Sequence, residues 1–429
     1  MVILCHLLLA MTGFISAQPL TAAFMAGTAR LEITPPIGYS MGGYGARKGV
    51  STGIHDPLFV TALVLKTEKE TLVFITCDLV IASSLRVESE IQRRFGISNV
   101  LISSSHTHSG PSMRPHTRHT PEIPSAMSMW WKQTENKFIQ AVGQANANLF
   151  PARIGAGTGH IHIGHNRRKV FPDGTVKMFW RNATKEPTRP VDPIVTVLRI
   201  DDSSGNPKVV LVNYSCHPTV LGPDNLQISA DYVGVMREYV EKKIPGSTCL
   251  FIFGASGDIN PYFDKQPITE NPFEAVEWTG NRLGRTVVQT THKITTQSID
   301  ENSLSYISKV HEVRHRFNAD QTVKIATSVG VLSDTIGFVS FSADPFVQHQ
   351  IRLREQSKPA ITFVFAHTST KGIPYAQYLP TIRAAVEGGY GADRMTSAEV
   401  GTGEVLVDLS IVQLLKLMGR LPSVTDTLQ

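Results

Sequence analysis

Residues 71–80 read TLVFITCDLV, an apolar run rich in β-branched and aromatic side chains and interrupted by one acidic residue. A run of this kind is typical of a strand that is covered on both faces of its sheet. The amphipathic segment SLRVESEIQRRFG follows at 84–96, and a second apolar run, VLIS, stands at 100–103. Strand, helix and strand in this order predict an α/β protein.

The same alternation continues along the chain. Further strand-like runs are LFVTALVLKT (58–67), IVTVLRI (194–200), KVVLVNYS (208–215), CLFIFG (249–254), SLSYISKVHEVRHRF (303–317), GFVSFSA (337–343) and ITFVFAH (361–367). Helix-like segments lie at 124–150, 230–244, 272–295 and 405–419. No repeat, linker or composition break divides them. We therefore expect an α/β fold of mixed β-sheets flanked by helices, with the active site at strand ends.

The first residues predict an exported protein, and the net charge bears on its partners. VILCHLLLAMTGFISA is uncharged, apolar and ends in small residues, which predicts a secretory signal over 1–17 and one mature domain over 18–429, secreted or periplasmic. No other run is long enough to cross a bilayer. Cleavage leaves Cys77, Cys216 and Cys249, an odd number that leaves room for one bridge at most. The net charge of +5 is thinly spread, which argues against nucleic acid as a partner.

Polar residues follow three of the predicted strands. LISSSHTHSGP (101–111) places His106 and His108 after the first, and the two rings share one side if the backbone there is extended. NYSCHPTVLG (213–222) places His217 before a proline that favours extended backbone. The third segment, FGASGDINP (253–261), carries Ser256, Asp258 and Asn260. An isolated HxH pair is ordinarily a surface or hydrogen-bonding feature, but three such strand ends together indicate a site.

The residue types in these segments suit a catalytic zinc. Such a zinc takes three or four N, O or S ligands and leaves a position for water, whose pKa it lowers to about 7. His106 and His217 offer two nitrogens from separate strand ends. Cys216 is the strand neighbour of His217, faces the opposite way and is expected in the core.

One pair of histidines and two further polar residues each allow two interpretations, one structural and one functional. In GHIHIGHNRR (159–168), His160 and His162 fit a strand surface better than a second metal site. Arg167 either holds a carboxylate or oxyanion, or belongs to a solvated basic turn. Asp78 either orients a ligand histidine or caps the following helix.

The motifs SSSHTHSGP, NRR, NYSCHP, GASGDINP and YAQYLPT…EGGY, taken together, are quite specific. With ARLEITPPIGYSMGGYG near the start, they resemble the catalytic N-terminal domain of the neutral (alkaline, non-lysosomal) ceramidase family over nearly the whole mature chain. The resemblance implies a zinc ion (Zn²⁺) held by His106, His217, Asp344 of SADPF and Tyr378 of QYLPT. It also implies that His108, Arg167 and Tyr390 lie in the substrate pocket.

The chain departs from the family pattern in three ways. GDINP stands where the family has GDVSP, so Asn260 replaces a serine implicated in catalysis. An amide can donate a hydrogen bond to an oxyanion but cannot form an acyl-enzyme, which favours attack by zinc-bound water. Asp344 is one methylene shorter than the family's glutamate, so its backbone lies nearer the metal or its contact is indirect. The family's immunoglobulin-like C-terminal domain has no counterpart after Tyr390, and a different pocket rim is expected.

The sequence thus predicts a zinc-dependent, ceramidase-like hydrolase of a linear amide, such as N-acylsphingosine or a related N-acyl amide. Arg167, Tyr390 and Asn260 are expected to stabilise the oxyanion, with Asp258 also at the substrate. His108 is expected to pass the proton to the leaving amine. Expected partners are a small-molecule or lipid amide and, peripherally, a membrane surface. The alternatives are a zinc esterase or phosphatase, and an inactive family member that binds without zinc.

Overall fold

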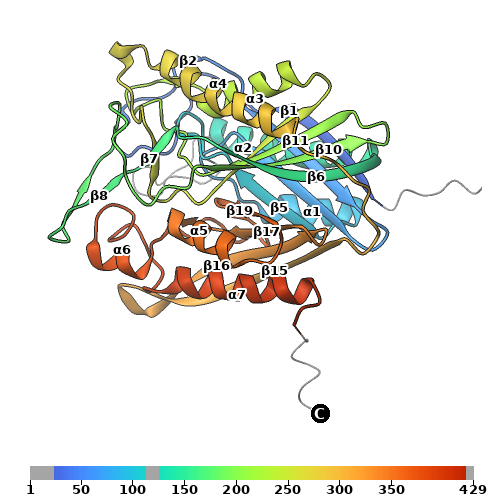
Figure 1. Cartoon of the computed structure of the whole chain (residues 1–429). Coiled ribbons are helices and arrows are strands. Elements are labelled where there is room, and N and C mark those ends of the chain that lie inside the picture. Colours follow the sequence, from blue (N-terminus) through green and yellow to red (C-terminus); the bar gives the residue numbers. More distant parts are fainter. Residues whose placement is uncertain (1–23, 113–124, 422–429) are drawn as a thin grey trace, which may run out of the picture.

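The computed structural model describes residues 24–112 and 125–421, and two β-sheets packed face to face form its centre (Figure 1). The larger sheet has the strand order β13-β11-β10-β6-β1-β3-β4-β5-β20. Its strands are β1 (Met25–Glu32), β3 (Phe59–Lys66), β4 (Thr71–Cys77), β5 (Asn99–Ser104), β6 (Phe150–His160), β10 (Ile194–Asp202), β11 (Pro207–Tyr214), β13 (Thr248–Phe253) and β20 (Thr368–Ser369). The pairs β4/β5 and β11/β13 are parallel and the others antiparallel, so the sheet is mixed as predicted.

The smaller sheet has the order β15-β16-β17-β19. It consists of β15 (Leu304–His315), β16 (Asn318–Leu332), β17 (Ile336–Phe341) and β19 (Ile361–Phe365), with β17 and β19 parallel. Two-stranded pairs complete the described strands: β2 (Gly53–Ile54) with β12 (Gln227–Ile228), β7 (Gly164–Asn166) with β14 (Ile259–Pro261), β8 (Arg168–Val170) with β9 (Val176–Met178), and β18 (Asp344–Pro345) with β21 (Tyr378–Leu379). The sequence did not predict β16, because its first half is polar and exposed.

Helices cover the outer faces of both sheets (Figure 1). On the larger sheet lie α1 (Leu85–Phe95), α2 (Ser125–Ala147), α3 (Tyr232–Lys243) and α4 (Pro272–Thr291). On the smaller sheet lie α5 (Val347–Gln356) and α7 (Thr402–Leu417), and the short helices η1 (Ile268–Glu270) and α6 (Ile382–Glu387) lie in connections. The expected helix over 124–150 ends at Ala147, because β6 begins at Phe150, and α5 and α6 were not predicted.

Burial on both faces explains why the strands read as unbroken apolar runs. In β3, Leu63 and Leu65 face the smaller sheet, whereas Ala62 and Val64 pack under the helices. Between the sheets the ring of Phe338 lies 5.3 Å from that of Phe74 and 5.6 Å from that of Phe365. The sheets therefore share one aromatic core, and their strand ends are held in a fixed relation.

Three expectations concern the cysteines, membrane-spanning helices and the start of the chain. Cys77, Cys216 and Cys249 are free and buried, and Cys216 lies in the core as expected. Within the described ranges, no helix has the length and apolarity needed to span a bilayer. The expected signal over 1–17 lies outside the described residues.

One chain crossing and one aromatic ring bring the strand ends together. After β19 the chain passes through Ala366 and His367 into β20, which pairs antiparallel with β5 at the edge of the larger sheet. The ring of Phe253, the last residue of β13, lies 5.1–5.5 Å from the rings of His106, His217 and His367. The ends of β5, β11, β13 and β19 thus meet at the junction of the two sheets.

Asp78 has neither of the two roles considered from the sequence. Ser84 caps α1 by accepting a hydrogen bond from the Val87 amide. The Asp78 carboxylate instead accepts the Phe59 amide at 2.9 Å and pairs with the buried guanidinium of Arg237 at 2.9 and 3.1 Å. This ion pair ties the end of β4 to α3.

We predict that Asp78→Ala lowers the free energy of unfolding by about 3–5 kcal/mol, because it leaves the Arg237 charge buried and unpaired. Equilibrium urea unfolding measures the change. The double variant Asp78→Leu, Arg237→Met should lose less than the single one, since no charge is then stranded. Equal losses in the two variants would contradict this account of the pair.

Candidate metal centre

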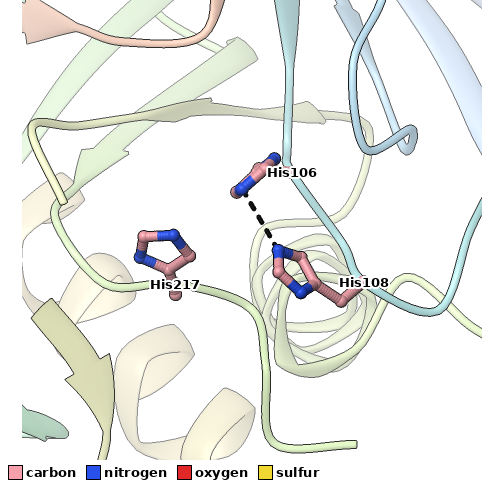
Figure 2. Close-up of side chains that lie close together, drawn as sticks. All are labelled: His106, His108 and His217. Atoms are coloured by element: carbon pink, nitrogen blue, oxygen red, sulfur yellow. Dashed lines mark hydrogen bonds between the residues drawn. The ribbon is translucent and has the colours of Figure 1, made fainter. Parts of the chain in front are cut away.

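Four imidazoles and one carboxylate gather where the strand ends meet. This histidine–aspartate cluster consists of His106, His108, His217, His367 and Asp344, none of them more than 9% exposed. Two sets of donor atoms lie within 4.8 Å of one another: those of His106, His108 and His217, and those of His106, Asp344 and His367. Figure 2 shows the first set, with all three rings facing a common centre. The cluster therefore places the ends of both sheets around one small volume.

His106 stands on a sharp turn rather than on extended backbone. β5 ends at Ser104 and His106 has φ +65°, so the backbone does not stay extended through 105–108, the condition under which strand alternation would place the two rings on one side. Its Nδ1 lies 2.7 Å from the carbonyl oxygen of Val80, which can only accept, so Nδ1 carries the proton and Nε2 keeps its lone pair. The turn still brings the Nε2 atoms of His106 and His108 to 3.1 Å (Figure 2).

His217 is oriented in the same manner from another strand. Its amide donates to the carbonyl oxygen of Ile259 at 3.1 Å, and its Nδ1 lies 3.0 Å from that oxygen. Nε2 is therefore the lone-pair nitrogen, and it has no hydrogen-bond partner in the described part of the chain. A backbone carbonyl that fixes the second ring nitrogen is typical of metal-ligating histidines.

Asp344, the first residue of β18, brings the only carboxylate of the cluster. Its Oδ2 lies 3.5 Å from Nε2 of His217 and 3.4 Å from Nε2 of His367. Neither oxygen accepts a side-chain hydrogen bond from residues 24–112 or 125–421, although the side chain is fully buried. Burial raises the pKa of this carboxyl to about 7, even though the nearby Arg167 charge and a backbone hydrogen bond from Ser256 oppose the rise, and a bound cation would remove this cost.

The donor separations fit a zinc ion. Zinc binds nitrogen and oxygen at about 2.0–2.2 Å in tetrahedral geometry, so neighbouring donors lie about 3.3–3.6 Å apart. The two contacts of Asp344 fall in this range. Burial also lowers the pKa of His106 and His367 to about 3 and that of His217 well below its usual value. The rings are neutral, with lone pairs free for a metal.

The sequence missed His367, which follows β19 and has φ +50°. Its ring stacks between that of His106, at 3.8 Å, and that of Tyr375, at 4.3 Å. The signal was present, since ITFVFAH places a histidine directly after an apolar strand, as in the segment of His106. It carried no weight because the resemblance assigned no ligand there.

Arg167 lies beside the cluster and is buried, which excludes a solvated basic turn. Its Nη2 donates to the carbonyl oxygen of Gly257 at 2.5 Å, and its Nη1 donates to Oδ1 of Asn260 at 3.1 Å. The guanidinium carbon lies 5.1 Å from the ring centre of Tyr390 and 5.4 Å from that of Tyr378. Arg167 thus joins Asn260 to the two predicted tyrosines.

The remaining predicted residues divide between the cluster and its support. Tyr378 pairs with Asp344 across the β18/β21 bridge, and its phenol hydrogen-bonds with Arg167. Asp258 holds the framework: its Oδ1 accepts the Val347 amide at 2.8 Å, and its Oδ2 accepts Nδ2 of Asn166 at 2.7 Å. The exposed histidines His160 and His162 lie outside the donor sets found among the described residues.

Known proteins share both sequence and fold with this chain. Residues 24–263 match the family model of the neutral/alkaline non-lysosomal ceramidases, N-terminal. Neutral ceramidase A of Dictyostelium discoideum is 27% identical over 292 residues, covering 59% of this chain and 40% of that protein. Neutral ceramidase of Drosophila melanogaster is 27% identical over 263 residues, covering 56% and 36%. The chain thus spans about two fifths or less of the length of these relatives.

The fold has a counterpart among solved structures. The crystal structure of neutral ceramidase from Pseudomonas aeruginosa superposes with a TM-score of 0.72 at 17% identity, covering 94% of this chain and 75% of that one. A ceramidase described as complexed with C2 gives the same TM-score at 16% identity. The predicted α/β class of mixed sheets is confirmed. Because the family model covers more than half of its residues, the chain belongs to the neutral/alkaline non-lysosomal ceramidase family.

Proposed function

We propose that this protein is a zinc-dependent hydrolase that cleaves the amide of ceramide, or of a related N-acyl amide, into a fatty acid and an amine. The observation that carries the proposal is the buried Asp344 carboxylate, which faces imidazole nitrogens at 3.4–3.5 Å and accepts no side-chain hydrogen bond from the described residues. Membership of a ceramidase family supports amide hydrolysis.

The ligands that the resemblance offers are His106, His217, Asp344 and Tyr378. The lone-pair nitrogens of His106 and His217 and the carboxylate of Asp344 belong to the histidine–aspartate cluster, and Tyr378 stands next to Asp344 across the bridge. When bound, zinc would polarise the substrate carbonyl and lower the pKa of a water molecule, so that the water can act as a nucleophile near neutral pH. The chain holds these donors buried, where water competes poorly for them.

Arg167 and Asn260 are suited to hold the substrate oxygen. Nε of Arg167 and Nδ2 of Asn260 are buried donors without a hydrogen-bond partner in the ranges described. Donors kept in place for a developing oxyanion stabilise the transition state more than the ground state. Tyr390 packs against the Arg167 guanidinium and limits its movement. Asn260 has no nucleophilic oxygen, so direct attack by water fits this chain better than an acyl-enzyme.

His108 is suited to transfer the proton from the attacking water to the leaving nitrogen. Its Nε2 lies 3.1 Å from that of His106, and its Nδ1 has no partner among the described residues. An imidazole beside the attacked carbon can accept the proton of the water and deliver it to the departing nitrogen. Asp258 acts on the substrate indirectly, since both of its oxygens hold neighbours of Arg167 and Asp344.

We further propose that residues 18–429 act as one catalytic domain on an exported protein. His106 and His217 lie within the segment that matches the family model, whereas Asp344, Tyr378 and Tyr390 come after it. One centre therefore needs both parts of the chain. A lipid amide at a membrane surface is the expected substrate.

The purified protein should contain about one zinc per chain, and His217→Ala should lose both the metal and amide hydrolysis. Removing one lone-pair nitrogen leaves too few donors around the ion. Elemental analysis and release of a fluorescent amine from a short N-acyl amide are the measurements. His311→Asn, on β15, is the control and should keep both properties.

The substrate class is tested with matched analogues. Amide, ester and phosphate forms of one lipid are compared at equal concentration, and the amide should be turned over with the highest kcat/KM. A preference for the ester or phosphate would replace the amidase by the alternative hydrolases. Wild-type protein free of zinc and inactive on all three would leave only a binding protein.

Arg167→Lys should lower kcat/KM about 10²–10³-fold, because a lysine cannot hold Gly257 and Asn260 and also present a fixed donor to the substrate oxygen. The zinc content should stay unchanged, since Arg167 is not a donor to the metal. Elemental analysis beside steady-state kinetics separates the two properties. An unchanged kcat/KM would remove Arg167 from the oxyanion site.

Gly43→Ala tests the placement of His108. Gly43 has φ +87°, and a Cβ there would lie 2.3 Å from Cγ of the His108 ring, which must then move. A displacement of about 1 Å can lower turnover about 100-fold, and zinc should remain bound. Gly45→Ala is the matched control, because its Cβ meets no atom within 4 Å. Equal turnover of the two variants would argue against His108.

A further inference from the structure

We infer that His367 is a direct protein ligand of the metal, so that this chain binds its ion through His106, His217, His367 and Asp344. The inference rests on the proposed zinc site and changes the donor set that the resemblance offers. His367 takes the place there given to Tyr378, whose phenol remains a partner of Arg167.

Distance is the first support. Nε2 of His367 lies 3.4 Å from Oδ2 of Asp344, about the same separation as between that oxygen and Nε2 of His217. Donor atoms of His106, Asp344 and His367 lie mutually within 4.8 Å. The carboxylate is thus flanked by two imidazoles at the separation expected for neighbouring ligands of one zinc, about 3.3–3.6 Å.

The ring of His367 also lacks any other polar role among the described residues. Neither Nδ1 nor Nε2 has a hydrogen-bond partner there, although the side chain is 2% exposed. A histidine kept for the core normally satisfies at least one nitrogen, because an unpaired buried polar atom is costly. Stacking between His106 and Tyr375 holds the ring plane so that its edge meets Asp344.

The backbone holds His367 in the left-handed region, which only a few per cent of residues other than glycine adopt, asparagine, aspartate and histidine more often than the rest. Its amide donates to the carbonyl oxygen of Ala343, next to Asp344, and its carbonyl oxygen accepts the amide of Ser104. His106, two residues after Ser104, is left-handed as well. Conformations of this kind persist where surrounding structure enforces them, often at functional sites.

Tyr378 fits the other role. Its phenol hydrogen-bonds with Arg167, and its ring lies 5.4 Å from the guanidinium carbon and 5.7 Å from the ring of Tyr390. These contacts tie it to the part of the site that meets the substrate oxygen. His367 instead places Nε2 3.4 Å from the Asp344 carboxylate.

The experiment compares metal binding by wild type, His367→Asn and Tyr378→Phe after chelator stripping and reloading with Zn²⁺ or Co²⁺. Asparagine tolerates the left-handed backbone. His367→Asn should weaken zinc at least about 100-fold in chelator competition, beyond the 10–100-fold typical of outer-shell changes, and should alter the visible Co²⁺ spectrum. Tyr378→Phe should keep both. His349→Asn, an equally buried histidine on α5, is the control.

A second variant separates ligand loss from misfolding. His367→Gly also suits the positive φ, and added imidazole should restore its zinc binding and Co²⁺ spectrum, which a purely structural role would not allow. Wild-type zinc affinity and an unchanged Co²⁺ spectrum in His367→Asn would overturn the inference and leave the proposed function standing. Wild-type protein that binds neither ion would overturn both.

Discussion

The buried carboxylate of Asp344 is the constraint on which the site depends. It accepts no side-chain hydrogen bond from the described residues, and one of its oxygens lies 3.4–3.5 Å from imidazole nitrogens of His367 and His217. Four neutral rings cannot balance a buried negative charge, and the nearest permanent cation, Arg167, is engaged by Gly257 and Asn260. The divalent ion that we propose would satisfy the carboxylate and the ring lone pairs together, and it would make the cluster stable in a low-dielectric interior.

The fold meets that constraint through its strand ends. β5 and β11 deliver His106 and His217 from one sheet, and β18 and the crossing after β19 deliver Asp344 and His367 from the other part of the chain. The backbone carbonyl of Val80 then keeps the proton of His106 on Nδ1, and that of Ile259 does the same for His217. The aromatic core between the sheets keeps these ends in register. Packing and ligand geometry are therefore parts of one arrangement.

Much of this could be predicted from the sequence, for physical reasons. Strands buried on both faces leave long apolar runs, so β3, β4, β11 and β13 were recognised, and polar residues directly after such runs marked His106 and His217. β16 was missed because half of it is exposed. The turn at His106 was missed because a left-handed residue leaves no mark in the sequence unless it is glycine or asparagine.

Long-range partners were the harder part. Nothing in the sequence near Asp78 indicates Arg237, which lies 159 positions further along the chain. His367 was overlooked for a similar reason: its significance comes from Asp344 and His106, which only the folded chain brings to it. The donors that the resemblance offered are those typical of the family, whereas His367, the ligand that we infer, can be recognised only in the folded chain.

The position of Asp344 late in the chain has a consequence for how the protein matures. A nascent chain that has emerged only as far as residue 263 holds two nitrogens from this centre, and the carboxylate arrives more than 80 residues later, since Asp344 lies beyond the segment that the family model matches. Tight capture of the ion must therefore wait until the smaller sheet docks. Metal uptake would report completion of the last folding step, and a chain that is unfinished or truncated before Asp344 would not bind the ion tightly.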